Sequence, residues 1–304
     1  MSLSGLGLVG LALLILTGCH AKYDPYKLQV QQAQGLSLQG EQSFSQGDLH
    51  QASKNFSRAL EVSRAVDYPR GVARELNNLG AVALEQGDLK KARELFSQAW
   101  EINQFQQQWS DGSVTQANLA TVAQKAGKWE EAAQHLQLAQ DAAASSRSIP
   151  ARGRVLIRWA SFYLDQQNYA AAATSLDEAK KLATTLSLKG AWAYQKGRLA
   201  LAQKNTSDAL PLFHQALTYD RQVLDRSAMA ADLLSLGEAH QLRGEMSQAW
   251  DYFSRAFDVY FSLGKKASLS RCLARLEEVN TQGQLGNSLT RFQKEAQLKP
   301  PGDK

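Results

Sequence analysis

Cysteine and histidine side chains are the first candidates for nucleophilic or metal-binding chemistry in this 304-residue chain, and their spacing supports neither. The two cysteines and five histidines are Cys19, Cys272, His20, His50, His135, His214 and His240. No two of them have a metal-ligand spacing, and there is no HExxH, Walker-type phosphate loop or GxSxG motif. We therefore expect no catalytic residue, no metal site and no cofactor. An enzyme with an unrecognised site remains the alternative.

Cys19 ends an apolar segment at the start of the chain, where a thiol has a different use. The run from Leu6 to Leu16 has no charge and is too short to span a membrane comfortably, but it suits the apolar core of a secretory signal. A GxGxxG pattern at Gly5–Gly10 lies inside this run. It lacks the strand, the helix and the acidic residue that a dinucleotide site requires.

The sequence Leu16-Thr17-Gly18-Cys19 resembles the lipobox of bacterial lipoproteins. That resemblance implies cleavage before Cys19 and attachment of lipid to its thiol, which would anchor the chain to a membrane. His20 stands where an Asp usually retains such proteins at the inner membrane, so the resemblance implies the periplasmic face of the outer membrane. A plain signal peptide with an incidental cysteine is the alternative.

The remaining composition favours helices throughout. The chain is rich in Ala, Leu and Gln and poor in β-branched Val and Ile, and it has few Gly and Pro for its length. A buried parallel sheet would need Val/Ile-rich runs, so β-sandwich, β-barrel and Rossmann-type domains are excluded. The hydrophobic content of 44% excludes a disordered chain.

A repeat of about forty residues organises this helical sequence. Four columns agree in six copies: a small residue, an Ala twelve residues later, a large apolar residue four further on, and a second Ala three after that. The first column is Gly40, Gly80, Ala120, Ala160, Gly197 and Gly237. The large apolar column is Phe56, Phe96, Leu136, Leu176, Phe213 and Phe253. This spacing predicts two antiparallel helices per unit, packed closely where the small residues fall.

The segment Leu76–Gly80, the turn at Gly87-Asp88 and the Ala92, Phe96 and Ala99 columns resemble the tetratricopeptide repeat family. The resemblance covers about residues 28–280 and implies an all-α, right-handed solenoid of six units with a C-terminal capping helix region. The unit here is longer than the usual 34 residues, which predicts either longer helices or a longer link. We expect a signal peptide over residues 1–18, a lipidated tether over 19–27, the solenoid over 28–298 and a flexible tail over 299–304.

Resemblance to this family also implies a concave groove, built from the first helices, that holds segments of partner proteins. Asn78 and Asn118 occupy one repeat position, from which family members hydrogen-bond the backbone of a ligand. The alternative is that these amides connect neighbouring helices.

Basic residues are concentrated in the middle of the chain. Residues 147–204 contain ten Lys or Arg and three acidic residues, which gives +7 in a chain whose net charge is +5. Arg154, Arg158 and Arg198 fall in first helices, and Arg154 and Arg198 occupy positions that usually face the groove. An acidic segment or a C-terminal carboxylate of a partner would suit such a groove. An ordinary solvated helix face is the alternative.

These patterns predict a non-catalytic, lipid-anchored scaffold of the bacterial envelope that binds partner proteins. Such a scaffold could support a secretion, pilus or polysaccharide-export complex, or an envelope enzyme. We expect neither nucleic acid nor a small-molecule substrate as its ligand. A peptide-sensing regulator is the alternative function. Cys272 is expected to be a buried small hydrophobic residue, with an intermolecular disulfide as the alternative.

Overall fold

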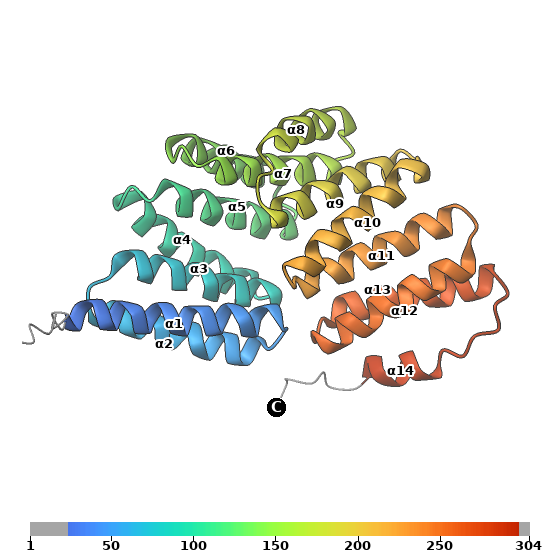
Figure 1. Ribbon diagram of the computed structural model, residues 1–304, viewed down its shortest axis with the longest axis horizontal. Helices are drawn as coiled ribbons and strands as arrows, with labels where there is room; N and C mark the ends of the chain where they lie inside the picture. The colour runs from blue at the N-terminus through green and yellow to red at the C-terminus, as the bar shows by residue number, and fades with distance from the viewer. Residues whose placement is uncertain (1–23, 298–304) are drawn as a thin grey trace, which may run out of the picture.

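The computed structural model describes residues 24–297, and within that range it is entirely helical (Figure 1). The helices are α1 Pro25–Ser45, α2 Leu49–Ala65, α3 Pro69–Glu85, α4 Leu89–Phe105, α5 Trp109–Lys125, α6 Trp129–Ser145, α7 Ile149–Asp165, α8 Tyr169–Leu182, α9 Leu186–Ala202, α10 Thr206–Gln222, α11 Arg226–Leu242, α12 Met246–Ser262, α13 Lys266–Gln282 and α14 Thr290–Gln297. Six helix pairs are followed by α13 and the short α14. This confirms the predicted solenoid of six units with a C-terminal cap.

The forty-residue unit consists of two long helices and two short turns. Helices α2 to α7 are each 17 residues long, and three residues separate each helix from the next. Longer helices, rather than a longer link, therefore account for the extra residues in each unit. The one interval of 37 residues is explained by α8, which has only 14 residues.

The turns follow the chemistry expected of helix ends. Most contain a residue with positive φ, as at Gly47 and Gly87, and the next helix begins from a polar cap. Asp48 Oδ1 accepts a hydrogen bond from the Gln51 N–H at 2.9 Å, and Asp88 Oδ1 accepts one from the Lys91 N–H at 3.0 Å. Asp48 and Asp88 therefore cap the helices that follow them, α2 and α4.

Each helix pair packs through the small and large columns of the repeat. A Cβ added to Gly80 would lie only 2.6 Å from Cε1 of Phe96, so the ring occupies the space where a side chain would stand. Gly197 has the same relation to Phe213. Where the small residue is Ala, at Ala120 and Ala160, the partner is the smaller Leu136 or Leu176, buried in the same cluster. The summed volume of each pair is thereby kept nearly constant.

The first helices of the units form the inner layer of the solenoid. The odd-numbered helices α1, α3, α5, α7, α9 and α11 each contact the next odd-numbered helix, whereas consecutive second helices up to α12 are not in comparable contact. Contact between successive members of one layer means that this layer follows the shorter, concave path. Figure 1 shows the resulting arch, with α1–α2 at one foot and α12–α14 at the other.

The structure describes residues 24–297, so it covers only part of the predicted domain boundaries and none of the predicted lipid-attachment motif. Helix α1 begins at Pro25, three residues before the predicted start of the solenoid. Residues 1–23, including Cys19 and His20, and residues 298–304 lie outside the described residues. Between residues 24 and 297, no helix is both long and apolar enough to cross a membrane.

The Gly80–Phe96 contact gives a direct test of packing within a unit. We expect Gly80→Ala to lower the free energy of unfolding by about 1–3 kcal/mol, because the added methyl group displaces the ring. The same change should cost less in a Phe96→Leu background, which reproduces the Ala–Leu pairing of other units. Urea denaturation of the two single variants and the double variant measures this coupling. Equal costs of Gly80→Ala in both backgrounds would contradict the pairing.

Candidate functional site

The candidate site lies on the concave layer, where α3, α5 and α7 lie side by side. A cavity of about 380 Å³ opens between α3 and α5 and is lined in part by Arg70, Arg74, Asn77, Asn103 and Asp111. This volume is at the lower end of the range for ligand pockets. Most of the lining is polar, so the cavity suits a polar group rather than a hydrocarbon chain.

A buried carboxylate fixes the floor of this region. Glu75 on α3 is fully buried, and its Oε1 receives the Arg74 Nε–H at 2.8 Å. Its Oε2 accepts hydrogen bonds from Ser37 Oγ at 3.0 Å and from Asn78 Nδ2 at 3.1 Å. The carboxylate therefore connects α1 to α3 and orients the guanidinium of Arg74, since a buried charge must be paired and hydrogen-bonded.

Two polar atoms at the cavity have unused hydrogen-bonding capacity. Arg74 Nη2 and Asn103 Oδ1 are buried and have no hydrogen-bond partner among residues 24–297. Asn103 is only 2% exposed, and its Nδ2 donates to Thr115 Oγ1 at 3.2 Å. Both residues line the cavity, and an amide group that reached these two buried atoms would satisfy both, because an amide carries a donor and an acceptor.

Arg154 and Arg158, both on α7, extend this region with positive charge. Both side chains are exposed to solvent, and neither has a hydrogen bond or ion pair among the described residues. Desolvation by the surrounding protein nevertheless lowers the pKa of each guanidinium. The Asp111 carboxylate opposes the shift at Arg154, whereas the like charge of Arg154 adds to the lowering of the Arg158 pKa. Two unpaired, partly desolvated cations make a site for an anionic group.

Arg198 has a different environment from these two arginines. Its Nη2 forms an ion pair with Asp165 Oδ1 at 2.7 Å, and its Nη1 donates to Gln195 Oε1 at 2.9 Å and to Ser161 Oγ at 3.3 Å. The side chain thus connects α9 to α7. Its proposed contact with a ligand stays a prediction, but any ligand must share this guanidinium with Asp165.

The two predicted asparagines contact neighbouring polar groups. Asn118 Nδ2 on α5 donates to Asn77 Oδ1 on α3 at 3.1 Å, across the boundary between two units. Asn78 donates to the buried Glu75. The Asn118 contact corresponds to the alternative that these amides connect neighbouring helices, whereas the Asn78 contact lies within α3. Whether either amide also binds a ligand backbone stays a prediction.

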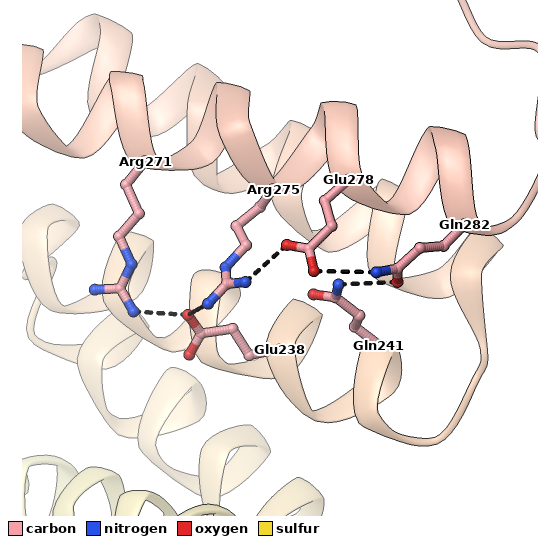
Figure 2. Close-up of polar contacts among 6 residues, drawn as sticks. All are labelled: Glu238, Gln241, Arg271, Arg275, Glu278 and Gln282. Carbon is pink, nitrogen blue, oxygen red and sulfur yellow. Dashed lines mark hydrogen bonds and ion pairs between the residues drawn. The ribbon is translucent and has the colours of Figure 1, made fainter.

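The C-terminal end of the concave layer shows how arginines are neutralised elsewhere (Figure 2). Arg271 on α13 pairs with Glu238 Oε1 on α11 at 2.6 Å, and Arg275 lies 3.6 Å from the same oxygen. Arg275 also pairs with Glu278 at 2.8 Å. Gln282 donates to Glu278 and accepts from Gln241, which completes a continuous row of side-chain contacts between α11 and α13. Within residues 24–297, Arg154 and Arg158 form no ion pair of this kind, although Asp111 acts electrostatically on Arg154.

Sequence reasoning found the two arginines but not the cavity beside them. Arg74 stands in the same repeat column as Arg154, six residues before the small residue, and that register could have identified it. Asn103 lies near the end of a second helix and carried no signal. In residues 24–297 no group of three or more His, Cys, Asp or Glu side chains could hold a metal ion. Cys272 is fully buried, as predicted, and burial raises the pKa of its thiol to about 12.

Comparison with known proteins agrees with this architecture. A family model described as tetratricopeptide repeat matches residues 31–104, which span the first two units. No curated protein matches the chain. Among solved structures, the apo form of RapI has a TM-score of 0.59 at 16% identity and covers 81% of this chain and 87% of its own.

A Rap protein complexed with Competence and Sporulation Factor has a TM-score of 0.59 at 13% identity, covering 87% of this chain and 76% of its own. BtubC (BKLC) from P. vanneervenii has a TM-score of 0.53 at 17% identity, covering 69% of this chain and 90% of its own. At these identities the likeness is one of fold. Together with the repeat columns, these findings define the fold: a tetratricopeptide-type α-solenoid.

A second group of buried carboxyls, away from the cavity, makes stability depend on pH. Asp232 on α11 is fully buried and Asp220 on α10 is 5% exposed. Burial, and then the neighbouring carboxylate, raises the pKa of Asp232; burial, and then Asp225, raises that of Asp220. No N–H or O–H of another described residue donates to Asp232. A hydrogen bond between the two carboxyls therefore requires a proton on one of them.

Because the folded state holds this proton, we can predict the direction in which stability changes with pH. The folded state keeps a proton that the unfolded chain releases near pH 4, so stability falls as pH rises from that value towards the raised pKa of the folded state. The slope should reach about 1.4 kcal/mol per pH unit. Asp232→Asn, whose amide can donate to Asp220, should remove most of this slope and raise stability at pH 8.

Urea denaturation between pH 5 and pH 9 measures the effect. Asp141→Asn, at an exposed position on α6, is the matched control and should leave the slope unchanged. If wild type and Asp232→Asn have the same pH dependence, the shared proton is wrong.

Proposed function

We propose that this protein is a non-catalytic scaffold that binds a partner protein through one segment held on its concave face. The observation that carries the proposal is the pair Arg154 and Arg158, two guanidiniums without a carboxylate partner in the concave layer. Elsewhere in that layer, Arg198, Arg271 and Arg275 are paired. An acidic side chain of the partner would supply the missing counter-charge.

We propose that the cavity beside the arginines binds a backbone or side-chain amide of the same partner segment. Arg74 Nη2 can donate to a carbonyl oxygen, and Asn103 Oδ1 can accept from an amide N–H. Asp111 lines the cavity and also acts electrostatically on Arg154, so the two parts are close together. We call Arg74, Asn103, Arg154 and Arg158 the concave strip. It suits an extended segment with an amide next to an acidic residue.

The fold gives general support to a binding role. Tetratricopeptide-type solenoids expose a long concave surface, and their fold is usually non-catalytic. The similar Rap protein was solved in complex with Competence and Sporulation Factor, so a solenoid of this arrangement can hold a bound partner.

Charge reversal at the arginine pair tests the strip. We expect a fluorescein-labelled decapeptide of alternating Gln and Glu to bind the wild-type chain, and Arg154→Glu with Arg158→Glu to weaken that binding by at least about tenfold, or 1.4 kcal/mol. Arg198 is left unchanged because its ion pair with Asp165 supports the packing of α9 on α7.

Fluorescence anisotropy at low and high salt gives the affinities. The control is Lys90→Glu with Lys91→Glu on α4, which changes the net charge equally at two exposed positions. Equal weakening by both double variants would mean that overall charge, and not the strip, attracts the peptide.

We further propose that Cys19 carries lipid and places the scaffold in the bacterial envelope, at the periplasmic face of the outer membrane. The support is the Leu16–Cys19 motif and the residue that follows it. The partners would then be envelope proteins, such as components of a secretion, pilus or polysaccharide-export complex, or an envelope enzyme.

Metabolic labelling with a clickable fatty acid tests the anchor. Wild-type chain should take up label and Cys19→Ala should not. Cys272 should contribute little, because its thiol is fully buried and burial raises its pKa to about 12. Label retained by Cys19→Ala, or absent from the wild-type chain, would rule the anchor out.

A further inference from the structure

The two ends of the solenoid contact each other through their turns. Gly47 lies in the turn between α1 and α2, and Leu263 directly follows α12. A Cβ added to Gly47 would lie 2.6 Å from Leu263 Cα and 2.9 Å from the Leu263 carbonyl oxygen. Leu263 is only 3% exposed. Figure 1 shows these two feet of the arch next to each other, so the first unit is in direct contact with the sixth.

An ion pair lies beside this contact. Lys265 Nζ, in the turn before α13, is 2.9 Å from Glu85 Oε2 at the end of α3. The same ammonium group donates to Ser227 Oγ at 2.6 Å. Both members of the ion pair are partly exposed. We call Gly47, Glu85, Leu263 and Lys265 the latch.

Comparison with the equivalent turns separates the latch from the general needs of a helix end. Gly47 and Gly87 occupy corresponding turns with nearly the same φ, +83° and +82°. A Cβ at Gly87 would meet nothing within 4 Å, and the same holds for Gly127 and Gly244. Replacement of Gly47 or Gly87 by Ala therefore carries the same backbone strain. Only the change at Gly47 also forces the two ends of the solenoid apart.

The latch consists of few interactions, and none of them is required by the fold of the units. Units of a solenoid are stabilised by their neighbours, so the fold does not require contact between its ends. Among residues 24–297, a turn-on-turn contact and a partly exposed ion pair join the two ends, and salt screens such pairs. A closure with few buried contacts can open without unfolding of the units.

We propose that the latch holds the arch closed around its concave strip and that partner binding is faster when the latch opens. This proposal rests on the proposed function, because Arg74, Arg154 and Arg158 of the strip lie on helices of the concave layer that the closed arch surrounds. A closed arch admits a thin extended segment from its open faces, whereas an open arch also admits it between the two feet. Opening therefore sets the rate at which a segment of a larger partner reaches Arg154 and Arg158.

Carbodiimide crosslinking of the full chain tests closure without any ligand. The reagent joins a carboxylate and an amine in contact as an amide, so wild type should yield a Glu85–Lys265 crosslink by mass spectrometry. Gly47→Ala should lower its yield by about tenfold, while Gly87→Ala should retain it, because only the former separates the turns. Equal yields in the two variants, or no crosslink in wild type, would overturn the latch.

Stopped-flow association of the Gln/Glu decapeptide, attached to a folded carrier protein, tests gating. Gly47→Ala and Glu85→Gln should bind several-fold faster than wild type. Gly87→Ala and Glu130→Gln, the latter a neutralisation of an exposed carboxylate on α6, should match wild type. Equal rates in all variants overturn gating. If neither wild type nor Gly47→Ala binds the peptide, the proposed function and the gating both fail. The crosslink yields still decide whether the latch exists.

Discussion

The contact between a small residue of one helix and a large apolar residue of the next is the constraint on which this structure depends. In four units Gly faces Phe, and in two units Ala faces Leu, so each pair of helices has the same space to fill. Close packing of one pair sets the distance between its helices. Six similar pairs then stack with the first helices on the inside, and that curvature creates the concave layer.

The concave layer contains polar groups that are neutralised in different ways. Glu75 and Asp232 occupy one repeat column, five residues before the small residue, and both are fully buried. Glu75 receives hydrogen bonds from Arg74, Ser37 and Asn78. Asp232 receives no such hydrogen bonds among the described residues, and burial together with the neighbouring Asp220 raises its pKa. Arg154 and Arg158 form no side-chain hydrogen bond or ion pair among residues 24–297, which is why we assign them to a partner.

Features that recur along the chain could be predicted from the sequence. The helix pairs, the packing columns and the caps at Asp48 and Asp88 are local, and each occurs in several units. Side-chain partners were not predictable in the same way. Arg198 and Arg158 look alike in sequence, but Asp165 lies within reach of the former only. The contact between the two ends depends on curvature accumulated over six units, and in sequence Gly47 is indistinguishable from Gly87.

The central claim, that a partner segment lies on the concave layer, is tested most directly by site-specific photo-crosslinking in cells. Benzoylphenylalanine at Val114, which lines the cavity, is compared with the same residue at the exposed Leu138 on the outer helix α6. We predict that one partner is crosslinked at position 114 alone and that the crosslinked peptide contains acidic residues. A partner captured at position 138 and not at position 114 would contradict the claim.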